Sequence, residues 1–151
     1  MTSDLINPAA CNCLALRQAG RHVSQFYDQF LASCGLRTTQ YSILARLHRR
    51  GPMTINALAG ELVMDRTTLG RNILPLQRDG LIEVGLGRTD RRSKELRLSR
   101  SGAARFGAAV KVWGEAQARF EAEFGVKRAK QLRALLHEIA TNEPTATPAM
   151  A

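Results

Sequence analysis

The sequence has few of the residues that close a small fold covalently or hold a metal ion. Only three cysteines, Cys11, Cys13 and Cys34, and three histidines occur among its 151 residues. An odd number of cysteines, all in the first quarter of the chain, does not build a closed disulfide framework, so free thiols are expected. Cys11, Cys13 and His22 lack the spacing of zinc ligands. We therefore expect no metal site and no cofactor.

Long apolar runs and catalytic motifs are missing as well. No segment approaches the roughly 18 consecutive apolar residues of a membrane span, and the first 30 residues lack the charged start and apolar block of a secretory signal. A cytoplasmic protein with no membrane partner is expected. Because no Gly-rich phosphate loop and no nucleophile in a catalytic motif occurs, we do not expect an enzyme.

Acidic residues are scarce relative to basic ones, with 13 Asp and Glu against 22 Lys and Arg and a formal net charge of +9. The excess lies in the middle of the chain, where residues 37–105 carry 14 basic and 6 acidic side chains. Eighteen of the 22 basic residues are arginine, whose planar guanidinium suits phosphates and guanine edges. The composition favours a nucleic-acid partner over a merely solvated basic surface.

The length is that of one domain, and the spacing of apolar residues divides it into helices. Asn7 and Pro8 are typical of a helix start, and the periodic pattern that follows continues to about Ser33 before Gly35 ends it. A second helix begins near Thr38 and is stopped by a Gly-Pro pair.

Two short helices come next, in the pattern of a helix-turn-helix motif. The first spans residues 56–63, and Asp65 is placed to cap the second, which spans residues 66 to about 79. Pro75 removes one backbone hydrogen bond and is expected to bend or loosen the last turn. The inward row of this helix consists of Leu69, Ile73 and Leu76, and its opposite face carries Thr67, Gly70, Arg71, Leu74 and Arg78.

The hydrophobic period then changes from about 3.6 to 2, which indicates two strands. In the first strand Ile82, Val84 and Leu86 alternate with polar or small residues, and Leu96 and Leu98 do so in the second. This alternation predicts two strands that face each other across a polar loop. The loop between them, residues 87–93, is a basic hairpin tip.

Two helices are expected after the hairpin, from residue 99 or 101 to Gly125 and from Val126 to Ala140, followed by a disordered tail at 141–151. The first of them carries an apolar stripe that one chain of this size does not cover comfortably, which predicts a homodimer. The stripe consists of Phe106, Val110, Trp113, Phe120 and Phe124.

These elements predict a mostly α protein with a small β-hairpin, a winged helix-turn-helix with long terminal dimerisation helices. Residues 1–140 form a single domain in this interpretation, with dimerisation helices at 8–33 and 100–140 and the winged helix-turn-helix at 38–99. The second helix of the motif would read base edges in the major groove, and the wing would contact the backbone or the minor groove of double-stranded DNA. The predicted DNA-binding residues are Arg66, Thr67, Thr68, Arg71, Arg78, Arg88, Asp90, Arg91 and Arg92.

A resemblance to a known family covers nearly the whole chain and rests on residues 58–102. Their sequence, LAGELVMDRTTLGRNILPLQRDGLIEVGLGRTDRRSKELRLSRSG, resembles the recognition helix, D-x-R wing and following strand of the MarR family of bacterial transcriptional regulators. The resemblance implies that Asp90 fixes the wing and that Arg92 reaches DNA. It also implies a homodimer with intertwined first, fifth and sixth helices, which represses genes until a small molecule or an oxidant reaches it. Arg37 departs from the pattern, because the family often has a capping Thr there.

The hypothesis is therefore a sequence-specific regulator, expected to be a repressor released from an inverted-repeat operator by an aromatic or largely apolar small molecule. A non-specific architectural DNA-binding protein is the less favoured class. The predicted effector-binding residues are Arg17, His22, Phe26, Tyr41, His48 and Trp113.

Two interpretations of the early cysteines stay open. Cys11 and Cys13 are candidates for a thiol switch, because a peroxide-sensing branch of the family carries its reactive cysteine early in the first helix. The alternative is that both are inert packing residues.

Overall fold

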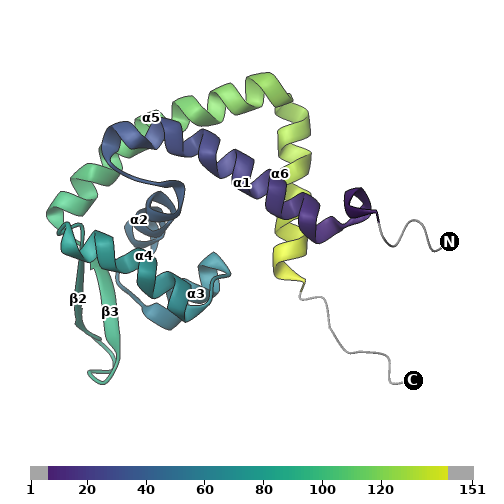
Figure 1. Cartoon of the computed structure of the whole chain (residues 1–151). Helices are drawn as coiled ribbons and strands as arrows, with labels where there is room; N and C mark the ends of the chain where they lie inside the picture. Colours follow the sequence, from purple (N-terminus) through teal and green to yellow (C-terminus); the bar gives the residue numbers. More distant parts are fainter. Residues whose placement is uncertain (1–6, 143–151) are drawn as a thin grey trace, which may run out of the picture. The chain divides into compact units, whose positions relative to one another are not determined.

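The structure is a computed structural model that describes residues 7–142. Over these residues it contains six α-helices, two 3-10 turns and one three-stranded sheet (Figure 1). The elements are η2 (Pro8–Ala10), α1 (Asn12–Leu31), η3 (Ala32–Cys34), α2 (Thr38–Arg50), β1 (Met53–Thr54), α3 (Ile55–Leu62), α4 (Arg66–Arg78), β2 (Ile82–Leu86), β3 (Lys94–Leu98), α5 (Arg100–Phe124) and α6 (Val126–Thr141). The mostly α fold with a small β-hairpin is as predicted. The tail predicted to be disordered lies, from residue 143 on, outside the described residues.

The start of the first helix differs from the prediction. Asn7 does cap a helical turn, because its Oδ1 accepts the amide of Ala9 at 3.0 Å, but that turn is the three-residue η2. Cys11 then has an extended backbone, with ψ of 109°, and its Sγ accepts the amide of Leu14 at 3.4 Å. The continuous helix therefore begins at Asn12 rather than at residue 8, because Cys11 caps it.

Helix α2 begins where it was expected despite the arginine at position 37. The Gln40 side chain accepts the amide of Arg37 at 3.0 Å. Asp28, on α1, accepts the amide of Thr38 at 2.6 Å and its hydroxyl at 2.7 Å. The carboxylate of one helix thus caps the next, which fixes the tight α1–α2 connection.

The chain divides into two compact units, the first extending to Ala116 and the second beginning at Gln117. In the first, helices α2, α3 and α4, the sheet and the first part of α5 enclose the hydrophobic core. The sheet order is β1-β3-β2, and both pairs are antiparallel, with Met53 opposite Leu96 and Ile82 opposite Leu98. The largest fully buried side chains are Leu31, Ile43, Leu44, Leu58, Leu69, Leu76, Ile82 and Leu96.

The prediction about the apolar stripe of α5 is wrong, and the alternating apolar residues of β2 are not all buried. On β2 Ile82 is buried, whereas Val84 and Leu86 are exposed, because the hairpin extends past the helices that cover its base (Figure 1). On α5 Phe106 belongs to the core of its own chain, and Trp113 packs against that core. The aromatic stripe on α5 is therefore not a continuous patch that only a second chain could cover.

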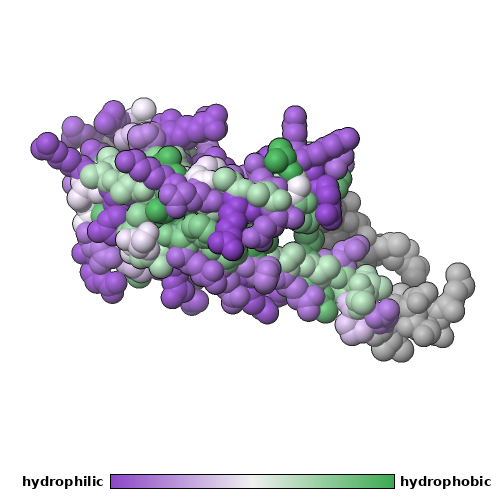
Figure 2. Space-filling view, turned by 90° about the horizontal axis from the view of Figure 1, so that it is seen from above, coloured by the Kyte–Doolittle hydropathy of each residue, from purple (hydrophilic) through white to green (hydrophobic). Residues whose placement is uncertain are grey.

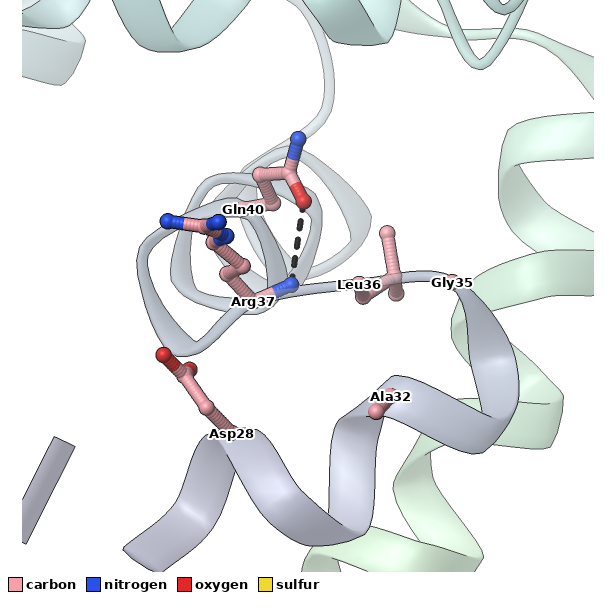
Figure 3. A pocket seen from close by; sticks show the side chains of 6 residues that line it. All are labelled: Asp28, Ala32, Gly35, Leu36, Arg37 and Gln40. Atoms are coloured by element: carbon pink, nitrogen blue, oxygen red, sulfur yellow. Dashed lines mark hydrogen bonds between the residues drawn. The ribbon is translucent and has the colours of Figure 1, made fainter. Parts of the chain in front are cut away.

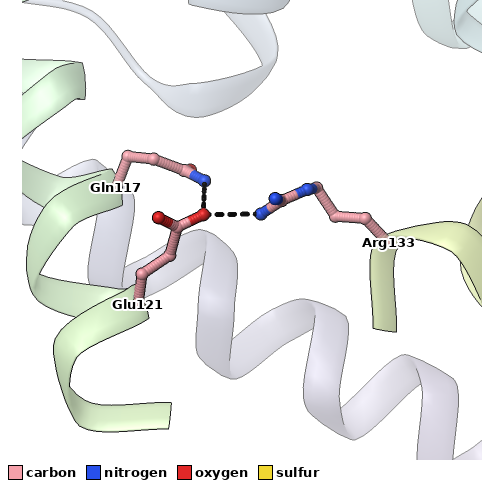
Figure 4. A network of polar contacts seen from close by, with 3 residues as sticks. All are labelled: Gln117, Glu121 and Arg133. Atoms are coloured by element: carbon pink, nitrogen blue, oxygen red, sulfur yellow. Dashed lines mark hydrogen bonds and ion pairs between the residues drawn. The ribbon is translucent and has the colours of Figure 1, made fainter. Parts of the chain in front are cut away.

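The second unit consists of the end of α5 and the whole of α6, joined by a polar network (Figure 4). Glu121 Oε1 accepts hydrogen bonds from Arg133 Nη1 at 2.8 Å and from Gln117 Nε2 at 2.9 Å. These contacts hold the pKa of the Glu121 carboxyl below its ordinary value. Phe120 and Phe124 stack at 5.4 Å, with the Arg128 guanidinium 4.4 Å from the Phe124 ring centre.

Helix α6 leaves several large apolar side chains exposed on the single chain. Hydrophilic side chains cover much of the face seen in Figure 2, and apolar ones are visible between them. The exposed side chains of α6 are Val126, Leu135, Leu136 and Ile139, with 37–66% of their surface accessible.

Candidate nucleic-acid interface

The helix-turn-helix is formed by α3 and α4 and is built from local capping contacts. Thr54 caps α3 through its Oγ1, which accepts the amide of Ala57 at 3.2 Å. Val63 ends α3 in the left-handed conformation, with φ of 49°. Asp65 caps α4, since Oδ1 accepts the amide of Thr68 at 2.8 Å and Oδ2 accepts its hydroxyl at 2.6 Å. These hydrogen bonds to Thr68 lower the pKa of the Asp65 carboxyl and fix where α4 begins.

Helix α4 buries one face and exposes the other. Leu69, Ile73 and Leu76 are buried, as their spacing predicts. Pro75 lies inside the helix, which nevertheless continues to Arg78. The five predicted DNA-binding residues of this helix are all exposed: Arg66, Thr67, Thr68, Arg71 and Arg78.

Two of these exposed side chains already have partners within the chain. The hydroxyl of Thr68 donates to Asp65, so it takes part in capping α4. Arg78 Nε lies 3.5 Å from the Asp79 carboxylate. Arg71, near the middle of the helix, is the basic side chain best placed to reach a groove from this face.

The wing is the loop between β2 and β3, and hydrogen bonds within it hold its shape. The carboxylate of Asp90 accepts the amide of Arg92 at 2.9 Å, and its backbone carbonyl accepts the hydroxyl of Ser93 at 2.8 Å. Gly87 is required at the base, because a Cβ there would collide with the carbonyl of Asp90 and the hydroxyl of Ser93. Arg88, Arg91 and Arg92 are therefore presented from a closed turn, and all three are exposed.

The turn after α4 is joined to the start of α5 by several close contacts. The amide of Ser99 donates to the carbonyl of Leu81 at 3.1 Å. The hydroxyls of Ser99 and Ser101 both donate to the carbonyl of Gly80, at 2.5 and 2.9 Å. A Cβ at Gly102 would collide with the carbonyl of Leu81. The turn after α4 and the first turn of α5 are thus fastened together without free space.

The structure places the six predicted effector-binding residues in two groups. The ring of Tyr41 stacks on Trp113 at 5.7 Å, and Phe106 lies 5.5 Å from Tyr41 and 4.8 Å from His48. Burial raises the pKa of the Tyr41 phenol. These three predicted residues therefore pack as an aromatic cluster around Phe106. The other three lie on α1, where Arg17 and His22 are exposed and Phe26 contacts Tyr27 and Phe30.

A pocket that the sequence did not predict lies between the end of α1 and the start of α2 (Figure 3). Its volume is about 480 Å³. Asp28 in its wall is the residue that caps α2, and no periodic pattern marks a contact between residues ten positions apart. The lining residues are Asp28, Ala32, Gly35, Leu36, Arg37 and Gln40.

Both early cysteines are exposed on the single chain, so within it they are not the buried packing residues of one interpretation. Among residues 7–142, no three His, Cys, Asp or Glu side chains are grouped to hold a metal ion. Within the same range, no helix is long and apolar enough to cross a membrane.

Comparison with known proteins places this geometry in a family. The sequence profile of the MarR family matches residues 36–94, which include α2, both helices of the helix-turn-helix and the wing. The comparison with curated proteins found no match.

Solved structures extend the likeness to most of the chain. The transcriptional regulator MosR from M. tuberculosis is 34% identical, with 89% of this chain and 98% of that chain covered and a TM-score of 0.75. MosR in complex with DNA is 34% identical, with 87% and 99% covered and a TM-score of 0.71. A probable transcriptional regulator from Pseudomonas aeruginosa is 26% identical, with 87% and 98% covered and a TM-score of 0.77.

CouR shares the fold at lower identity. The transcriptional repressor CouR bound to a 23-mer DNA duplex is 24% identical, with 87% of this chain and 94% of that chain covered and a TM-score of 0.78. CouR from Rhodococcus jostii RHA1 bound to p-coumaroyl-CoA is 22% identical, with 95% and 99% covered and a TM-score of 0.75. The family profile and the MosR structures together assign the chain: it belongs to the MarR family of transcriptional regulators.

Proposed function

We propose that the chain binds double-stranded DNA sequence-specifically, with α4 in the major groove and the wing on the backbone or in the minor groove. The observation that carries the proposal is that the nine predicted DNA-binding residues are all exposed and belong to two elements, α4 and the closed wing. Thr67 and Arg71 lie on the face of α4 opposite its buried row, where side chains can reach base edges. MosR, the 34% identical relative, has been solved in complex with DNA.

Selection from a random duplex library, followed by footprinting, tests sequence-specific binding. A non-specific architectural protein would enrich no sequence. With the selected duplex, Arg71→Ala is expected to cost about 1–3 kcal/mol and to relax base preference at one position. Arg92→Ala serves as the comparison, because loss of a phosphate contact weakens binding to all sequences alike. Equal losses for Arg71→Ala on selected and unrelated duplexes would refute its reading role.

The functional species in this proposal is a homodimer that pairs through its terminal helices and binds an inverted repeat. The exposed apolar residues of α6 support it, because surfaces of this kind are unfavourable in water unless a partner covers them. A two-fold dimer presents two recognition helices about one DNA turn apart. In sedimentation analysis, Leu136→Asp is expected to shift the protein toward monomer, since a buried unpaired charge is costly. A folded wild-type monomer that binds a full operator would contradict the dimer.

Repression relieved by a small apolar or aromatic effector completes the proposal. CouR combines the same fold with a repressor's function and a bound p-coumaroyl-CoA. An effector releases DNA only if it binds better to a dimer whose recognition helices no longer fit the groove, so effector and DNA must weaken each other reciprocally. Titration of the protein–duplex complex with aromatic acids and their acyl-CoA esters tests this. A reporter gene placed behind the selected operator tests whether binding lowers transcription.

An oxidant sensor is the second candidate function, favoured by the exposure of both Cys11 and Cys13. Hydrogen peroxide would transfer one oxygen to a cysteine sulfur as its O–O bond breaks, giving a sulfenic acid and releasing water. The test replaces both cysteines by serine and measures release of DNA by peroxide and by aromatic ligands. Loss of the peroxide response in the double variant, with no ligand effect on the wild type, would favour the thiol switch over the effector.

A further inference from the structure

Leu74 is an apolar side chain in the middle of the surface that α4 presents to DNA in the proposed function. It lies on the face opposite the buried row of Leu69, Ile73 and Leu76, and 64% of its surface is exposed. In projection along the helix it falls about 20° from Thr67 and about 60° from Arg71. An exposed leucine here lies among residues that are otherwise polar, basic or glycine.

Gly70 leaves the helix surface next to Leu74 open. The residue one turn before Leu74, toward which its side chain leans, is Gly70, which has no side chain. A Cβ built on Gly70 would have nothing within 4 Å apart from its two chain neighbours and the helix backbone, so the Leu74 side chain does not lie against it. Leu74 is therefore free of close contact on this side, with Arg71 nearby on the same exposed face.

The spacing of the residues on this exposed face suits a helix that lies in a major groove. Thr67, Gly70, Arg71 and Leu74 stand at positions i, i+3, i+4 and i+7, the spacing from which homeodomain helices contact bases. Leu74 lies about 10 Å along the axis from Thr67, the length of about three base-pair steps. The 5-methyl group of thymine is the apolar feature of the base edges in that groove.

We propose that Leu74 is a specificity-determining residue that contacts the 5-methyl group of one thymine in each half-site. The inference rests on the proposed function, because it requires α4 to enter the major groove. Arg71 then supplies the polar part of the readout and Leu74 the apolar part, so the preferred half-site contains a thymine beside the base pair that Arg71 reads.

The test removes one methyl group at a time from the DNA. Each thymine of the duplex selected by the wild-type protein is replaced by deoxyuridine, which keeps the base pair and loses only the methyl group. Binding by wild type and Leu74→Ala is measured by fluorescence anisotropy. Leu86→Ala is the matched control, since Leu86 is a leucine of the same exposure, 65%, but is the last residue of β2, outside α4 and the predicted DNA-binding residues.

Burial of one methyl group corresponds to about a fourfold change in affinity. We expect wild type to lose about fourfold at one thymine per half-site, and about fifteenfold when both copies are replaced. Leu74→Ala should bind the thymine and deoxyuridine duplexes alike, whereas Leu86→Ala should keep the wild-type discrimination.

Two results would overturn the assignment of Leu74. One is a wild-type protein insensitive to every deoxyuridine replacement, and the other is a Leu74→Ala variant that discriminates as wild type does. Both leave sequence-specific binding intact, and either one would be consistent with a contact of Leu74 to sugar or backbone only. Failure to select any sequence would overturn this inference together with the proposed function.

Discussion

Gly70 offers the sharpest test of whether α4 enters DNA. Alanine at an interior helix position is more favourable than glycine by about 1 kcal/mol. The Cβ at position 70 would meet nothing within 4 Å beyond its own helix neighbours, so no steric cost offsets this gain. We therefore expect Gly70→Ala to stabilise the protein by about 1 kcal/mol, or about 3 °C in melting temperature for a chain of this size.

The same methyl group should weaken binding to the selected duplex. In the proposed complex it projects from the surface that approaches the groove, and forcing one extra carbon into a close-packed contact costs about 1–3 kcal/mol. Each of the two recognition helices of a dimer would suffer this loss. A single substitution should thus raise stability and lower affinity, a combination that general damage to the fold does not produce.

Thermal unfolding and fluorescence anisotropy with selected and unrelated duplexes measure the two effects. Gly60→Ala on α3 is the matched control, because its Cβ also meets nothing within 4 Å and it lies outside α4, the wing and the terminal helices. This control variant should be more stable than wild type, with an unchanged affinity for the selected duplex. If Gly70→Ala binds DNA with wild-type affinity, this face of α4 does not approach DNA closely. If the variant is less stable than wild type, the conclusion that a Cβ at position 70 meets no steric obstacle is wrong.

Four further predictions follow from single residues. Phe106→Ala should lower the free energy of unfolding by about 3–5 kcal/mol in urea titration, whereas a loss below 1 kcal/mol would contradict its place in the core. Val63→Asn should raise the free energy of unfolding by about 1 kcal/mol, because a β-branched residue is strained at φ of 49° and Asn is not. An unchanged midpoint of urea unfolding would disprove the strain. Arg92→Ala should make the slope of log K against log salt shallower by about 2 in a dimer, if each copy neutralises one phosphate. Asp65 has a lowered pKa in the folded protein, so its contribution to stability is present above its unfolded value and lost as the pH falls through the folded one; the difference in stability between wild type and Asp65→Asn should shrink below about pH 4, and a constant difference would exclude this linkage.

Local signals in the sequence were sufficient to predict most of the fold. Asp65 caps α4, Gly80 ends it with φ of 72°, and the change to alternating periodicity marks the two strands of the hairpin. Each of these features is decided by the residue itself or by a near neighbour. The exposure of the predicted DNA-binding residues on α4 could be predicted for the same reason, because the buried row of α4 determines which face remains outside.

Features that depend on contacts between distant segments could not be predicted. The capping of α2 by Asp28 joins two helices, and the burial of Phe106 depends on Tyr41 and His48 of another helix. The exposure of Leu86 depends on how far the hairpin extends beyond the helices. Periodicity shows that a face is apolar, but it does not show which surface covers it, and the pocket beside Arg37 could not be predicted for that reason.

The connection between α4 and α5 couples the orientation of α4 to that of the start of α5. Because Ser99 and Ser101 hold the carbonyl of Gly80, and Gly102 has no room for a side chain against Leu81, a tilt at the start of α5 is transmitted to α4 rather than absorbed between them. Over the roughly 20 Å of α4, a tilt of about 10° displaces its far end by about 3 Å, close to one base-pair step. If α4 enters the major groove as proposed, a tilt of this size, shared by α4 and the start of α5, would therefore shift the helix by about one base pair relative to its site.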